Sequence, residues 1–300
     1  MNNHSEGKFT RRDFMKIGTA SLGAAAMAAS AFEPDAKAAN NVESMIGFKA
    51  APMDVVRVGF VGVGGMGSAH VKNLLNIKGV ELRAVCDLVE ERVARVQEWV
   101  VKAGGKKPEG YSKGEQDFKR LCDRQDIDLV YTATPWEWHA PIALAAMNAG
   151  KHAAIEVPVA PTLEECWQLV KTAEKTRRHC VMMENCCYDR PEMMCLNMVK
   201  KGLLGEILHA EAGYLHDLRK VKFGFIKKSE GHEHEWRLAH SIKRNGNLYP
   251  THGLGPVSQC MDINRGDRFA YLVSMSTPSR GLNLYAAKKL GPDQIGRAHV

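Results

Sequence analysis

The sequence predicts an α/β fold with a doubly wound parallel sheet, and three observations lead to this class. An apolar, β-branched segment at residues 55–61 runs directly into a G-x-G-x-x-G pattern at residues 62–67. Apolar strand-like segments then alternate with helical ones as far as residue 185, as in repeated βαβ units. Several predicted strands end in glycine or polar residues, and such sheets bind ligands at the carboxyl ends of their strands.

The glycine pattern is the most specific local motif. Gly62 permits a tight turn, Gly64 lets the backbone approach a pyrophosphate, and Gly67 lets the next helix pack closely on the strand. A second strand at residues 80–86 ends in Asp87, twenty residues after Gly67, where a carboxylate can bind ribose hydroxyls and repels a 2′-phosphate. This order predicts a Rossmann domain that binds NAD rather than NADP. A glycine-rich turn beside a surface aspartate is the alternative.

The remaining elements of this domain follow from periodicity and turn residues. Helices are predicted at residues 68–76, 90–103, 117–124 and 139–149, and strands at residues 127–134, 153–156 and 180–184. Residues 104–114 are rich in Gly, Lys and Pro and predict a loop. Thr162 is expected to cap a further helix, because Glu165 at the third helical position completes a capping box.

The pattern changes beyond a predicted domain boundary near residue 189. Residues 207–216 alternate between apolar and polar side chains, and together with a strand at residues 271–276 they predict an α+β domain with an open, mainly antiparallel sheet. The predicted organisation is a signal segment at 1–38, a linker at 39–53, the NAD-binding domain at 54–188 and an incomplete substrate domain at 189–294. Residues 295–300 match one reading frame of a common sequencing adapter, so we expect an artefact there and a longer natural protein.

The first residues predict an export signal. Thr10-Arg11-Arg12-Asp13-Phe14-Met15-Lys16 fits the twin-arginine pattern, and residues 36–38 offer a small-residue cleavage site. The Ala- and Gly-rich run between them is too short and too weakly apolar for stable membrane insertion. We therefore expect the twin-arginine machinery to export the protein to the periplasm. A chance arginine pair before an Ala-rich segment is the alternative.

Composition narrows the class of partners and ligands. Hydrophobic residues make up 45% and charged residues 25%, which is typical of a soluble globular protein. The formal net charge of +7 is spread along the chain without a basic run, so we expect no nucleic-acid binding. The eight cysteines lack C-x-x-C spacing, and His232 and His234 lie two residues apart in a charged segment, so we predict no metal.

Two segments carry a family resemblance. Residues 133–139, Ala-Thr-Pro-Trp-Glu-Trp-His, and Glu156-Val157-Pro158 resemble the glucose–fructose oxidoreductase and inositol dehydrogenase (Gfo/Idh/MocA) family. That family has Glu-Lys-Pro at the second motif, where the lysine polarises the hydroxyl being oxidised. The valine in this chain makes a simple sugar dehydrogenase a less favoured hypothesis.

Later motifs narrow the resemblance. Glu235-Trp236-Arg237, residues 245–256 with their Tyr-Pro-Thr-His stretch, and residues 261–267 resemble glycoside hydrolase family 109, the NAD-dependent α-N-acetylgalactosaminidases. The resemblance covers residues 11 to about 290 and implies hydrolysis through redox chemistry. NAD takes a hydride from sugar C-3, a base removes the acidified C-2 proton, and the glycosidic oxygen leaves C-1. Water then adds and the hydride returns, with retention of configuration and no net oxidation.

The resemblance also implies site residues, position by position. The implied NAD contacts beside Gly62, Gly64 and Gly67 are Gly65, Met66, Asp87, Trp136, Glu137, Trp138, His139, Glu156, Val157, Asn185, Tyr249, Pro250, Thr251 and His252. The implied substrate contacts are Tyr214, Arg237 and Tyr249, and the implied catalytic residues are His252 and Tyr249. Imidazole suits acid–base work at neutral pH because its ordinary pKa is about 6.5. A terminal α-N-acetylgalactosamine on a glycan or small molecule is the implied substrate.

Other interpretations stay open. His139 could cap a helix, Tyr214 could pack in a sheet, and Trp136 with Trp138 could be core aromatics. At the level of function, a net sugar dehydrogenase of the same fold and a periplasmic sugar-binding protein compete with the glycosidase. Fold alone does not separate these three. A homo-oligomer is compatible with the sequence.

Overall fold

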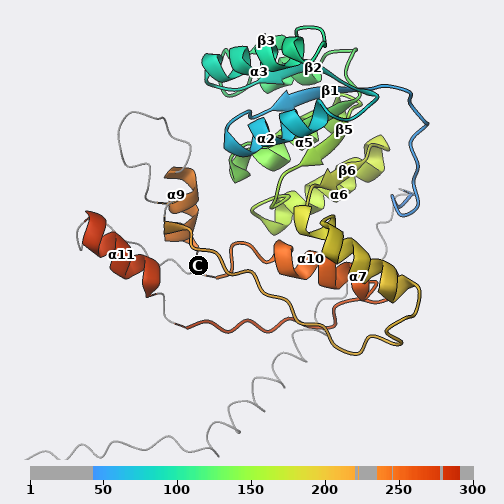
Figure 1. Ribbon diagram of the computed structural model, residues 1–300, viewed down its shortest axis with the longest axis vertical. Coiled ribbons are helices and arrows are strands. Elements are labelled where there is room, and N and C mark those ends of the chain that lie inside the picture. The colour runs from blue at the N-terminus through green and yellow to red at the C-terminus, as the bar shows by residue number, and fades with distance from the viewer. Residues whose placement is uncertain (1–42, 220–221, 223–234, 245, 278–279, 291–300) are drawn as a thin grey trace, which may run out of the picture. The chain divides into compact units, whose positions relative to one another are not determined.

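The computed structural model describes residues 43–219, 222, 235–244, 246–277 and 280–290 (Figure 1). The predicted signal segment at 1–38, the histidine pair His232 and His234, and residues 295–300 lie outside this part, so these predictions are not tested. The eight cysteines lie within it, and all are free thiols.

A six-stranded parallel sheet forms the centre of the fold (Figure 1). Its strands are β1 (Val56–Val61), β2 (Val80–Cys86), β3 (Glu109–Tyr111), β4 (Leu129–Thr132), β5 (His152–Ile155) and β6 (Cys180–Met182). They lie in the order β3-β2-β1-β4-β5-β6, so the chain winds outward in one direction from β1 and in the other from β4. This confirms the predicted doubly wound sheet and puts the switch point, where ligands bind in such folds, between β1 and β4.

Helices cover both faces of the sheet. The α-helices are α2 (Gly65–Leu74), α3 (Glu90–Lys102), α4 (Phe118–Cys122), α5 (His139–Asn148), α6 (Leu163–Thr176), α7 (Arg190–Lys200), α9 (Glu235–Lys243), α10 (Thr251–Cys260) and α11 (Gly281–Leu290), and the 3₁₀ turns are η1 (Trp136–Trp138) and η2 (Asn185–Cys187). Val58 and Phe60 of β1 pack with residues of α2 and α3, whereas Val61 packs with residues of α4, α5 and α6. The alternation along β1 therefore supplies two hydrophobic cores, one on each face.

Local chemistry explains two of these elements. At the start of α6, the Glu165 N–H donates to Thr162 Oγ1 at 3.2 Å and the Thr162 hydroxyl donates to Glu165 Oε2 at 2.6 Å, as the capping pattern predicts. Strand β3 lies inside residues 104–114, where a loop was predicted. It has three residues and pairs only with β2, so its strand character comes from that neighbour rather than from a sequence period.

The predicted antiparallel sheet is wrong for the described chain. Residues 207–216 and 271–276 are extended but form no strand (Figure 1). Leu215 is 99% exposed and Leu272 92% exposed, and within the described residues neither segment pairs with a strand. An alternating sequence forms a strand only where another strand accepts its hydrogen bonds.

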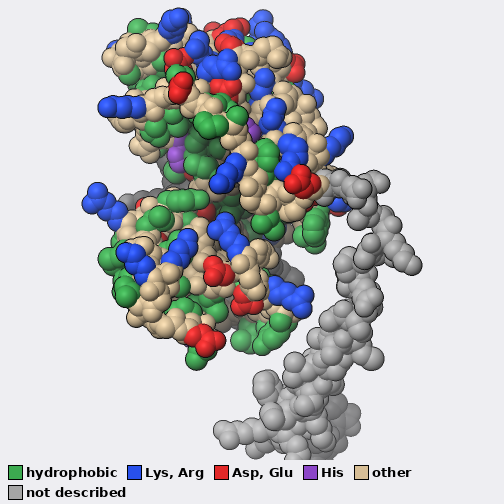
Figure 2. All heavy atoms as spheres, turned by 90° about the vertical axis from the view of Figure 1, so that its right-hand side faces the viewer, with side chains coloured by type: hydrophobic (Ala, Val, Ile, Leu, Met, Phe, Trp, Pro, Cys, Tyr) green, Lys and Arg blue, Asp and Glu red, His purple; other side chains and the backbone are tan. Residues whose placement is uncertain are grey.

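The surface agrees with the even spread of charge in the sequence. Lys and Arg side chains are scattered among Asp, Glu and hydrophobic side chains on the face drawn in Figure 2. Within the described residues, no helix combines the length and the apolar character that crossing a membrane requires.

Candidate functional site

The glycine turn after β1 is shaped as a dinucleotide site requires. Gly62 has φ +84°, and a Cβ there would lie 2.7 Å from the Thr134 side chain. A Cβ on Gly67 would lie 1.9 Å from the carbonyl oxygen of Gly62. Gly64 precedes α2, and Gly65 at the first position of that helix is exposed with open space around it. The turn therefore brings bare backbone and a helix N-terminus together, which fits a pyrophosphate.

Asp87 lies directly beside this turn. Its Oδ2 accepts the Val63 N–H at 2.8 Å and its Oδ1 accepts the Val89 N–H at 3.0 Å. Carboxylate oxygens accept more than one hydrogen bond, so they can still receive ribose hydroxyls. The residues thus fit the nucleotide that the sequence predicts. Met66 is 54% exposed on the first turn of α2, next to the same turn.

The turn after β4 contains the predicted cofactor residues Trp136, Trp138 and His139, and their side chains differ in whether a polar atom is left without a partner. Trp136 is buried, yet its indole N–H has no partner within the described structure. Trp138 packs against Phe118 in the core. His139 is buried with Nδ1 2.6 Å from the Pro158 carbonyl oxygen and Nε2 2.9 Å from that of Thr134.

The His139 ring therefore holds two loops together and has no free nitrogen for a ligand. Burial lowers its pKa, against the effect of the two carbonyl oxygens. A cofactor contact from His139 stays a prediction and would have to come from its backbone.

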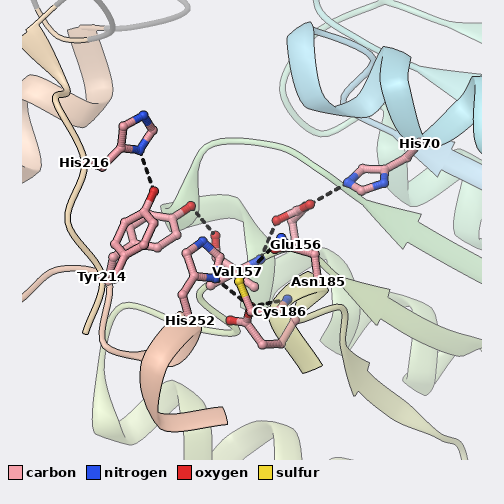
Figure 3. A network of polar contacts seen from close by, with 10 residues as sticks. His70, Glu156, Val157, Asn185, Cys186, Tyr214, His216 and His252 are labelled. Atoms are coloured by element: carbon pink, nitrogen blue, oxygen red, sulfur yellow. Dashed lines mark hydrogen bonds and ion pairs between the residues drawn. The ribbon is translucent and has the colours of Figure 1, made fainter. Parts of the chain in front are cut away.

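The turn after β5 holds a half-buried contact between Glu156 and His70 (Figure 3). Glu156 Oε1 lies 2.5 Å from His70 Nε2, and Glu156 Oε2 accepts the Val157 N–H at 2.7 Å. Burial raises the pKa of Glu156, but the hydrogen bonds from His70 and Val157 lower it overall, so this side chain is a carboxylate. Val157 is 2% exposed, and its carbonyl oxygen accepts the Tyr249 hydroxyl at 3.3 Å.

The predicted substrate and catalytic residues come together at these strand ends. The Tyr249 ring lies 4.8 Å from His252, 5.7 Å from Tyr214 and 5.7 Å from Trp136. The Arg237 guanidinium lies 5.8 Å from the Tyr249 ring and 5.5 Å from Trp136. We call Tyr214, Arg237, Tyr249 and His252 the aromatic cluster; aromatic faces with one cation suit an apolar sugar face and its polar substituents.

A buried carboxylate supports the imidazole of this cluster. His252 Nδ1 lies 2.6 Å from Glu184 Oε1, and Glu184 is 3% exposed at the end of β6 (Figure 3). Cys186 completes a group of three possible metal ligands whose ligand atoms lie within 4.8 Å of one another. Asn185 is exposed between Glu184 and Cys186, and its amide lies 3.7 Å from the Cys186 sulfur. Pro250 caps α10, and the Thr251 hydroxyl beside it is buried without a partner within the described residues.

Sequence reasoning missed four side chains of this site. His70 and Glu184 support Glu156 and His252, while Trp236 and His240 line the cluster at 5.1 and 4.9 Å from Trp136. His240 Nε2 also lies 3.3 Å from Glu137. Glu184 could have been found as the last residue before Asn185 at a predicted strand end. Trp236 belongs to the Glu-Trp-Arg motif of the resemblance but was given no role there, whereas His70 and His240 carry no signal in a single sequence.

Two family models match the chain in succession. The description "Oxidoreductase family, NAD-binding Rossmann fold" matches residues 56–184, and "Glycosyl hydrolase 109, C-terminal domain" matches residues 188–298. The first match agrees with the parallel sheet and the glycine turn. The class is thus an NAD-binding Rossmann protein of the Gfo/Idh/MocA type with an appended glycosidase-family domain.

Curated relatives make the assignment narrower. A glycosyl hydrolase family 109 protein of Shewanella pealeana is 49% identical over 293 residues, covering 95% of this chain and 62% of the relative. An alpha-N-acetylgalactosaminidase of Shewanella oneidensis is 52% identical over 251 residues, covering 84% of this chain and 54% of the relative. A solved structure of a putative oxidoreductase from Klebsiella pneumoniae matches with TM-score 0.43 and 25% identity, over 51% of this chain and 41% of that one. Residues 188–298 thus carry the C-terminal domain of glycosyl hydrolase family 109, and the chain spans about three fifths of the first relative's length.

Proposed function

We propose that the protein is an NAD-dependent exo-glycosidase that hydrolyses terminal α-N-acetylgalactosamine. The observation that carries this proposal is the position of the aromatic cluster. Tyr249 contacts Val157 and Trp136, which belong to the strand ends around the dinucleotide turn. A sugar held by the cluster would therefore stand next to a nicotinamide. The name of the Shewanella oneidensis relative supports the substrate.

The chain's own residues have separable roles in this proposal. Gly62, Gly67 and Asp87 would hold NAD, which when bound supplies a hydride acceptor and donor for the sugar. Tyr214 and Arg237 would orient the sugar ring. His252, with one nitrogen on Glu184, would move a proton at the oxidised carbon, where an imidazole is effective at neutral pH.

The residue at position 157 favours this hydrolysis over net oxidation. Val157 is buried and apolar where the dehydrogenases of the resembling family have a lysine, so no ammonium stands at that position. A net dehydrogenase would need another cation to polarise the hydroxyl. Arg237 is the charged group of the cluster, but its guanidinium lies against Trp136, Trp236 and Tyr249.

We further propose that the protein acts in the periplasm after twin-arginine export. Residues 11 and 12 with the small-residue site at 36–38 support this location. The twin-arginine route carries folded proteins, which suits an enzyme that keeps its nucleotide. Replacing Arg11 and Arg12 by Lys should hold the full-length protein in the cytoplasm, as measured by cell fractionation.

The direct test uses the full-length natural protein and an α-N-acetylgalactosaminide chromogenic substrate in D₂O. We expect hydrolysis without net change in NADH absorbance and with deuterium at C-2 of the released sugar. A product without deuterium at C-2 would indicate the two-carboxylate mechanism of ordinary glycosidases and contradict the proposal. Accumulating NADH would support the dehydrogenase instead.

His252→Ala tests the assignment of the acid–base group. We expect a loss of about 10²–10⁴-fold in kcat, the usual contribution of such a group, with NAD binding retained. His209→Ala is the matched control, because His209 is exposed. A loss below about tenfold in kcat would exclude the role.

A further inference from the structure

Glu184 is a buried carboxylate in which one oxygen has two hydrogen-bonding partners and the other has none among the described residues. Its Oε1 accepts the Cys186 N–H at 3.1 Å and lies 2.6 Å from His252 Nδ1. Its Oε2 has no partner among the described residues. A buried carboxylate oxygen without a donor is costly, so the site is short of positive charge.

The fold brings α10 unusually close to this carboxylate. Gly255 lies three residues after His252 on α10, and a Cβ there would lie 3.2 Å from Glu184 Cγ and 2.8 Å from Cys187 Sγ. The bare backbone at Gly255 thus lets the helix seat His252 against Glu184. The rings of Tyr214 and Tyr249 also lie next to the imidazole, at 4.7 Å and 4.8 Å between ring centroids.

This contact fixes the tautomer of the imidazole. A carboxylate can only accept, so the short contact requires the proton on Nδ1. Nε2, across the ring, then keeps its lone pair and can take a proton from a substrate. After proton uptake the imidazolium lies beside a buried anion, which offsets the missing charge at Glu184.

We infer that Glu184 is a positioning residue that holds His252 in its Nε2-basic tautomer and stabilises the imidazolium formed in the reaction. This inference rests on the proposed acid–base role of His252. The arrangement has the logic of a base oriented by a buried carboxylate, reached here with residues 68 apart in the chain.

A metal site is the competing interpretation of Glu184, Cys186 and His252. Donor atoms on one tetrahedral zinc lie about 2.0–2.3 Å from the ion and therefore more than about 3 Å from each other. The 2.6 Å between Glu184 and His252 is a hydrogen-bond separation instead. The geometry therefore favours the paired arrangement, and Cys186→Ala separates the two interpretations because it removes only the thiol.

The first experiment observes the tautomer directly in the full-length protein without substrate. In ¹⁵N-histidine NMR spectra at neutral pH, we expect one histidine, lost in His252→Ala, with a protonated Nδ1 and a bare Nε2. Glu184→Gln should change these shifts, whereas Glu206→Gln, at an exposed position, should not. A bare Nδ1 at His252 in the wild-type protein would overturn the inference.

The second experiment measures whether the two residues act as a unit. Glu184→Gln should lower kcat at least about tenfold, within the contribution of the base that it serves, with little change in KM or NAD affinity. The double variant with His252→Ala should be no slower than His252→Ala alone. Independent, multiplying losses would overturn the inference. If Glu184→Gln does not fold, Glu184→Asp and the wild-type spectrum decide.

Three outcomes distinguish failure of the proposed role of His252, failure of the inference about Glu184 and a metal site. If His252→Ala keeps full activity, the proposed function of His252 fails. If His252→Ala is inactive while Glu184→Gln is fully active, only the inference about Glu184 fails. If Cys186→Ala loses as much activity as Glu184→Gln and added Zn²⁺ changes the wild-type rate, the metal interpretation replaces ours.

Discussion

Residues 56–184 and residues 201–290 differ in how many hydrophobic side chains they bury. The first region contains nearly all of the buried hydrophobic side chains, which run from Val58 to Leu196. In the described part of the second region, the buried side chains are the polar Lys222 and Ser241. Many of its large apolar side chains, including Leu215 and Leu272, are exposed. The first region has its own core, whereas the second is best packed where the aromatic cluster meets the strand ends.

This difference separates two structural roles within the chain, a rigid framework and the side chains added to it. A packed parallel sheet supplies rigid strand ends for a cofactor, and rigid elements position such groups most accurately. The second region contributes a few side chains, such as His252 and Tyr249, to that rigid edge. Substitutions should therefore have large effects on folding in the first region and small ones in the second, outside the cluster.

The largest effect is expected at Gly67. Gly67→Ala puts a Cβ 1.9 Å from the Gly62 carbonyl oxygen, so α2 must move away from β1 and the dinucleotide turn must open. We expect loss of measurable NAD binding and a destabilisation of about 3 kcal/mol, at the upper end for overpacking. Gly281→Ala, with open space around it at the start of α11 and away from the dinucleotide turn, is the control in calorimetric NAD titration and urea unfolding. Equal behaviour of the two variants would contradict this account of the turn.

Leu121 and Leu272 provide the clearest direct comparison of the two regions. Leu121 is fully buried, whereas Leu272 is 92% exposed. In the 300-residue chain, Leu121→Ala should cost about 2–5 kcal/mol of unfolding free energy. Leu272→Ala should change that free energy by no more than about 0.5 kcal/mol. A large loss from Leu272→Ala in urea unfolding would mean that this segment is covered in solution.

Asp87 should affect the nucleotide more than the fold. Asp87→Ala leaves the Val63 N–H without its acceptor and removes the carboxylate for the ribose. We expect NAD to bind about tenfold more weakly and discrimination against NADP to fall. Isothermal titration with both nucleotides measures this, with the exposed Asp123→Ala as control. Unchanged preference for NAD would place its recognition elsewhere.

The smallest effect is a pH dependence from His139. Burial lowers the pKa of His139 below the ordinary 6.5, so the unfolded chain binds its proton more readily than the folded protein does. Stability should therefore fall as the pH drops below about 6.5, by up to about 1.4 kcal/mol for each unit that the pKa is lowered. His139→Gln removes this contribution, so the stability difference between wild type and variant should narrow from pH 7 to pH 5. A constant difference in urea unfolding would show that His139 titrates alike in both states.

The first region could be predicted largely from sequence because its signals are local. A few neighbouring residues are enough to predict the turn at Gly62, the strand that ends at Asp87 and the helix cap at Thr162. Strand β3 could not be predicted, because three residues pair through a neighbour. The segment at 207–216 shows the reverse error, since its alternation describes a strand whose partner the described chain does not supply.

The site divides in the same way. The structure brings together Tyr214, Arg237, Tyr249 and His252, which family resemblance had singled out one by one. Glu184 and His70 escaped prediction because their roles depend on contacts 68 and 86 residues away along the chain. A supporting carboxylate has no motif of its own, so only the folded arrangement identifies it.

The separation between Glu184 and His252 also has a consequence for protein synthesis. The ribosome completes the dinucleotide turn and all six strands before it reaches residue 184, and domains generally fold from the N-terminal side as they emerge. His252 emerges 68 residues later. A nascent chain can thus acquire its nucleotide fold while it still lacks the proposed base. The nascent chain would therefore stay inactive until the ribosome has synthesised α10.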